Sequence, residues 1–185
     1  MNGGPVAVEP IGTLPEAAIR IAVMVSPTIG GSGEFEQFLS VYYALQDAGA
    51  EAVIASASGG YSWPTTPKRA GEGDGNLEAR FRGDRKARDD LANTLQFRQI
   101  FVEDFHGGLC IGDPGAIWRD ADVDSAAALI ARFLQVGRPV AVLRRALEIE
   151  PEGAAAGLLI IGDNGWSHAV QALMAAARKN TRTLS

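Results

Sequence analysis

The chain has 185 residues, of which 46% are hydrophobic, and its formal net charge at pH 7 is −5. This length and composition predict one domain with one hydrophobic core. The acidic balance disfavours binding to nucleic acid, and no apolar run approaches the roughly 20 residues that span a bilayer. We therefore expect neither nucleic acid nor a membrane as a partner.

The N-terminal segment and the cysteine count narrow the class of protein further. Residues 1–18 are rich in Gly, Pro and small residues, and we expect a flexible arm there, followed by a domain at 19–185. The arm lacks the basic and apolar regions of a signal peptide, which predicts a cytoplasmic location. Cys110 is the only cysteine, and His106 and His168 are the only histidines, so we expect no metal site and no bound cofactor.

Patterns typical of strands and helices alternate along the rest of the chain. Continuous apolar runs predict buried strands at 19–25, 51–57, 107–111, 138–143 and 157–161. Apolar residues at helical spacing predict helices from Phe35 to a stop at Gly49, at 84–95, at 124–136, and after a cap at Ser167. The alternation predicts an α/β fold: a doubly wound, flavodoxin-like parallel sheet with helices on both faces.

The candidate pocket follows from this fold class, because ligands of open parallel sheets bind at the carboxyl ends of the strands. The loops at that edge contain charged, polar and aromatic candidates, namely Glu36, Gln37, Asp113, Arg144, Arg145, Asn164, Trp166 and His168. A polar stretch rich in Gly and Pro at 61–78 is longer than a simple connection needs, and a lid is one interpretation of it.

Five segments resemble, in order, those of the DJ-1/PfpI superfamily, which includes class I glutamine amidotransferase-like and Hsp31-type proteins. They are YYALQDAGAEAVIASASGG (42–60), RFRGDRKARDDLANT (80–94), DFHGGLCIGDPGAIW (104–118), GRPVAV (137–142) and LLIIGDNGWS (158–167). The resemblance covers roughly residues 21–177, and it implies the same doubly wound fold. Because relatives commonly form dimers, it also implies a homodimer or pairing with a related subunit.

The chain departs from the family at each catalytic position. The resemblance places Arg144 where the family has its cysteine nucleophile and Arg145 where it has the following histidine. The acidic partner aligns with Gln37, one residue from Glu36, and the family's GGHG oxyanion loop is replaced here by GDPG. In that loop, a proline has no N–H to donate and Asp113 adds negative charge where an oxyanion would form.

These departures lead to a hypothesis and two alternatives. The hypothesis is a catalytically degenerate protein, a pseudoenzyme, that binds a small anionic metabolite through its arginines, or a partner subunit. The first alternative is an enzyme of small-molecule metabolism, a lyase, hydratase or isomerase, with Glu36 or Asp113 as acid/base, Arg144 holding substrate charge and His168 assisting. The second is a chaperone-like protein with an exposed apolar patch.

Two residues have simpler interpretations that the structure can address. Cys110 lies within an apolar run, which favours a buried structural thiol over a replacement nucleophile. Asp113 precedes a proline, so it is either a turn residue, a salt-bridge partner of Arg144, or a general acid or base.

Overall fold

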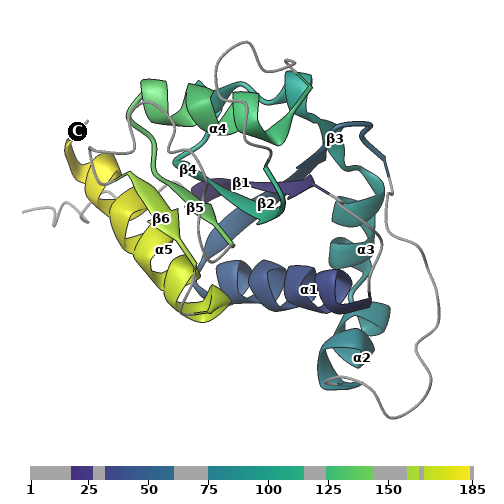
Figure 1. The fold of residues 1–185 in the computed structure, drawn as a ribbon. Coiled ribbons are helices and arrows are strands. Elements are labelled where there is room, and N and C mark those ends of the chain that lie inside the picture. Colours follow the sequence, from purple (N-terminus) through teal and green to yellow (C-terminus); the bar gives the residue numbers. More distant parts are fainter. Residues whose placement is uncertain are drawn as a thin grey trace, which may run out of the picture.

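The computed structural model describes residues 18–26, 32–60, 75–114, 124–143, 158–162 and 165–183. Almost all of the expected arm at 1–18, and residues 61–74 of the predicted loop, lie outside these ranges. The described residues form a six-stranded parallel sheet in the order β3-β2-β1-β4-β5-β6, with helices on both faces (Figure 1). This arrangement confirms the predicted doubly wound α/β fold.

The predicted strands are all present, with shifted ends. They are β1 (Ile19–Ser26), β2 (Ala50–Ser56), β4 (Gly107–Gly112), β5 (Val140–Val142) and β6 (Leu159–Ile161). A two-residue edge strand, β3 (Leu95–Gln96), was not predicted, because it is too short to show a pattern and a 3₁₀ turn (Phe97–Gln99) follows it directly.

The helices are α1 (Ser32–Asp47), α2 (Gly75–Gly83), α3 (Arg85–Ala92), α4 (Ala126–Gln135) and α5 (Trp166–Thr183). Residues 75–78 are therefore helical and do not belong to a loop. The helix predicted at 84–95 is shorter: Asp84 caps it by accepting the Ala87 N–H at 3.1 Å, and Asn93 ends it.

The prediction that Ser167 caps the last helix was wrong. Gly165 turns the chain with φ +104°, and its carbonyl accepts the Ala169 N–H at 3.4 Å. The first turn of α5 therefore closes on Gly165, and Ser167 lies inside that turn.

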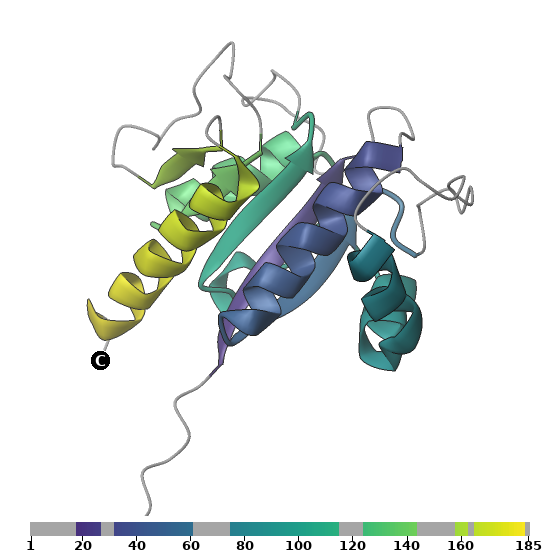
Figure 2. The ribbon, with the colours of Figure 1, turned by 90° about the horizontal axis from the view of Figure 1, so that it is seen from below.

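Alternation along the strands divides the core into two layers. In β1, Ile21, Val23 and Val25 pack toward α1, α3 and α5, whereas Ala22 and Met24 pack toward α4. Figure 2 shows α1 and α5 side by side on one face of the sheet. The α4 layer also contains the 3₁₀ segments between β3 and β4.

Candidate functional site

The strand order reverses between β1 and β4, and the carboxyl ends of these two strands lie side by side. Ser26 pairs with Gly112 there, and Gly112 has φ +91°. A Cβ atom at Gly112 would lie 2.1 Å from the Ser26 carbonyl oxygen. Only glycine therefore fits at this position, because any other side chain would collide with the backbone of β1. This contact lies at the switch point of the strand order, the position at which open α/β sheets bind ligands.

Cys110 lies in β4, two residues before Gly112, and its side chain is 0% exposed. It packs in the α4 layer of the core with Met24, Phe133 and Val142. Burial, and to a smaller extent the nearby charge of Asp113, raise the pKa of the Cys110 thiol to about 12. The thiol is therefore protonated at neutral pH, and the buried structural interpretation is confirmed.

The carboxyl ends of β4 and β5 lie side by side at this edge of the sheet. The Leu143 N–H donates to the Cys110 carbonyl at 3.0 Å, so β5 ends next to the residue that lies three positions before Asp113. Asp113 itself is half-buried and Pro114 is buried. Arg144 and Arg145 follow Leu143 directly in sequence, but they and Asn164 lie outside the described residues, as does the predicted Asp113–Arg144 pair.

Glu36 and Gln37 lie on α1, the helix that follows the carboxyl end of β1, and both are half-buried. The Ser40 hydroxyl donates to the Glu36 carbonyl at 2.9 Å within the same helix. The fold therefore brings α1 to the edge of the sheet where β4 leads into Asp113.

His168 and Trp166 lie in the first turn of α5 and have different surroundings. His168 is exposed, whereas Trp166 is half-buried and packs against the core layer that contains α1. The start of α5 lies close to the sheet, because a Cβ atom at Gly162 would be 2.9 Å from Leu143 and 3.2 Å from Ala169. Trp166 is thus a packing residue of this core layer.

Within the described ranges, no three His, Cys, Asp or Glu side chains come together as a metal-binding group. None of the helices in those ranges is both long and apolar enough to cross a membrane.

The chain matches no protein-family model and no curated protein. It is similar to a solved structure described as APC35852, with a TM-score of 0.57 over 88% of this chain and 99% of that one. The two chains therefore share the overall fold described above. At 15% sequence identity, this similarity shows the fold alone.

A second similar structure is the Rapid Encystment Protein 24 KDa (REP24) of Francisella tularensis. Its TM-score is 0.49 at 15% identity, and the match covers 68% of this chain and 58% of that protein.

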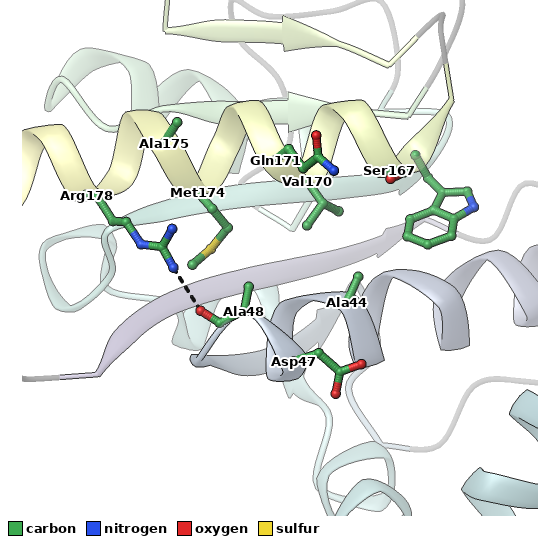
Figure 3. Close-up of a pocket in the computed structure, with 10 residues that line it drawn as sticks. Ala44, Asp47, Ala48, Ser167, Val170, Gln171, Met174, Ala175 and Arg178 are labelled. Carbon is green, nitrogen blue, oxygen red and sulfur yellow. Dashed lines mark hydrogen bonds between the residues drawn. The ribbon is translucent and has the colours of Figure 1, made fainter.

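The sequence did not predict the groove between α1 and α5, which has a volume of about 470 Å³. Figure 3 shows its side chains, which come from the two helices: Ala44, Asp47 and Ala48 from α1, and Trp166, Ser167, Val170, Gln171, Met174, Ala175 and Arg178 from α5. The sequence feature that indicates the groove is the presence of alanine on both facing helices, because small side chains leave space between two packed helices.

Proposed function

We propose that this chain is a divergent DJ-1/PfpI-superfamily pseudoenzyme that binds a small anionic metabolite at the carboxyl ends of β1, β4 and β5. The observation that supports it best is the complete burial of Cys110, the only cysteine of the chain. A thiol with a pKa of about 12 inside the core cannot serve as the family's nucleophile. The role that we propose for this edge of the sheet is therefore binding without thiol chemistry.

The preference for an anion rests on two arginines in the sequence and on two helix N-termini. Arg144 and Arg145 directly follow Leu143, the last described residue at the end of β5. Helices α1 and α5, of 16 and 18 residues, begin at the same edge, and helix N-termini favour negative charge. A carboxylate or a phosphate monoester matches both the guanidinium donors and the helix dipoles.

The negative charge of Asp113 narrows the class of ligand that we propose. Its half-buried carboxylate follows β4 at this edge and would repel an anion placed directly against it. A ligand with a hydroxyl or amine group toward Asp113 and its anionic group toward the arginines satisfies both charges. Small hydroxy acids and sugar phosphates have this chemistry.

A thermal-shift screen of such compounds tests the proposal. A ligand present at 100 times its Kd stabilises the folded chain by about 2.7 kcal/mol, which is a measurable shift in Tm. We expect Arg144→Ala to abolish that shift. Arg138→Ala is the matched control, because Arg138 precedes the same strand at its opposite, amino end, and this variant should respond as the wild type does.

Two outcomes would contradict the proposal. If no carboxylate or phosphate shifts the wild-type Tm, the chain does not bind a small anion at this edge of the sheet, and a partner subunit becomes the better hypothesis. If the wild type shows amidase or glyoxalase activity that Cys110→Ala removes, the chain uses its thiol and is not a pseudoenzyme.

A further inference from the structure

Among the residues that the structure describes, two large apolar side chains are exposed: Phe101 at 64% and Val136 at 44%. Phe101 directly precedes the 3₁₀ turn Val102–Asp104, which leads toward β4, and Val136 directly follows α4, which leads toward β5. Since β4 and β5 are parallel neighbours, both residues lie at the amino-end edge of the sheet. This is the edge opposite the one at which we propose ligand binding.

A hydrogen bond joins the two segments that carry these side chains. Arg132 of α4 donates from Nη2 to the carbonyl of Ile100, the residue before Phe101, at 3.0 Å. The Val136 N–H donates to the Arg132 carbonyl at 3.2 Å, so Val136 lies one helical turn beyond Arg132 on the same side of α4. Phe101 and Val136 therefore belong to adjoining parts of the molecular surface.

The backbone on both sides of Phe101 is held in place. Ile100 and Val102 are buried, at 0% and 2% exposed. The Ile100 N–H donates to the Phe97 carbonyl at 3.1 Å, and the Phe101 carbonyl accepts the Asp104 N–H at 3.0 Å. An aromatic ring on an ordered backbone loses little conformational entropy when a partner covers it, which is typical of interface anchors.

Charges of opposite sign lie on the two sides of Phe101 along the chain. Arg98 belongs to the 3₁₀ turn before Phe101 and Glu103 to the turn after it, and both are exposed. Within the described ranges, neither side chain forms an ion pair. Such a surface is self-complementary, because a two-fold axis at Phe101 places Arg98 opposite Glu103 of the partner subunit.

We propose that the Phe101 surface, made of Arg98, Phe101, Glu103 and Val136, binds the same surface of a second copy of this chain. The two Phe101 rings pack together at a two-fold axis, with Val136 of each copy beside them. Arg98 pairs with Glu103 of the partner subunit, and this contact occurs twice. The dimer leaves the carboxyl-end edge of the sheet open, so this proposal does not depend on the proposed function.

Sedimentation velocity of the full chain over a range of concentrations tests the apolar part of this contact. We expect the wild type to dimerise reversibly and Phe101→Ser to weaken the dimer by at least about tenfold. Phe101→Leu keeps an apolar side chain and should retain most of the self-association. The Phe101 side chain is mostly exposed, so its removal spares the core, and circular dichroism checks that the fold is kept.

Charge reversal tests the symmetry of the contact. Arg98→Glu and Glu103→Arg each place like charges opposite one another, so each variant alone should dimerise more weakly than the wild type. An equimolar mixture of the two variants should form a mixed dimer, because every charged contact then joins opposite signs. Arg85→Glu is the matched control: it makes the same charge change at an exposed position of α3, on the other face of the sheet, and should dimerise as the wild type does.

Three results would overturn this proposal. The first is a wild-type chain that sediments as a monomer at every concentration. The second is a dimer that Phe101→Ser and both charge variants leave unchanged, which would place the contact on another surface. The third is a mixture of the two charge variants that associates no better than either variant alone, which would exclude the pairing of Arg98 with Glu103 of the partner subunit.

Discussion

At the scale of single residues, His106 forms two hydrogen bonds with the backbone of Arg20. Its Nδ1 accepts the Arg20 N–H at 3.0 Å, while its own backbone N–H donates to the Arg20 carbonyl at 2.8 Å. Only an unprotonated Nδ1 can accept, so this contact requires the neutral imidazole. Burial, and then the positive charge of Arg138, hold the pKa of His106 below its usual value of 6.5.

This lowered pKa predicts how the free energy of unfolding depends on pH. The unfolded chain takes up the His106 proton at higher pH than the folded chain does, so the contribution is complete above pH 6.5 and is lost as pH falls below it. We expect a loss of about 1 kcal/mol, the value of one hydrogen bond. Urea unfolding above and below pH 6.5 measures it.

His106→Asn is the control for this prediction, because it keeps an acceptor but cannot titrate in this range. The part of the pH dependence that is due to His106 should disappear in this variant. Equal losses of stability in the wild type and in His106→Asn would show that other groups cause the effect.

The sequence predicted the surroundings of some residues but not the contacts between distant ones. The burial of Cys110 follows from the apolar run around it, which local pattern reveals. The contact between Gly112 and the Ser26 carbonyl joins residues 86 positions apart, and no local pattern encodes which strands become neighbours. The same limitation applies to the groove, because it depends on α1 and α5 packing on the same face.

At the scale of elements, two adjacent tyrosines of α1 join it to α2 and α3. The Tyr42 hydroxyl donates to Asp90 at 2.6 Å and accepts from Gln46 Nε2 at 2.6 Å. The Tyr43 hydroxyl donates to Asp84 at 3.3 Å, and the Arg80 guanidinium lies 3.9 Å from the centre of its ring. Burial raises the pKa of both hydroxyls, that of Tyr43 to about 12, so both stay protonated as donors.

The geometry predicts unequal effects when each hydroxyl is removed. Tyr42→Phe should cost about 1–2 kcal/mol, because two short hydrogen bonds are lost and Gln46 loses its acceptor. Tyr43→Phe should cost less than about 1 kcal/mol, because its single bond is long and the ring still packs under Arg80. Denaturant unfolding of both variants measures the difference, and a larger loss for Tyr43→Phe would contradict it.

Helices and strands were predicted better than their ends. Periodicity located α1, α4 and α5 from their buried faces. Their ends depend on single hydrogen bonds, such as the one from Ala169 to Gly165 that starts α5 before Ser167.

At the scale of the whole molecule, the rate at which a reagent labels Cys110 measures how often the sheet opens. It lies in β4, between β1 and β5, and is fully buried. We expect a thiol reagent to label the native chain only as fast as the sheet opens, so the labelling rate should rise with urea in parallel with unfolding. Rapid labelling that is independent of urea would show that Cys110 is accessible in the native state.

The pairing of β1 with β4 has a further consequence for folding. Strands β1 to β3 lie within residues 19–96 and β4 to β6 within 107–161, so each half of the sheet is built from neighbouring segments. Within the sheet, the pairing of β1 with β4 joins the two halves. Forming that pairing joins distant residues and is entropically the costliest step. A ligand bound at the switch point would contact residues of both halves. It would therefore make the unfolding of the two halves more cooperative.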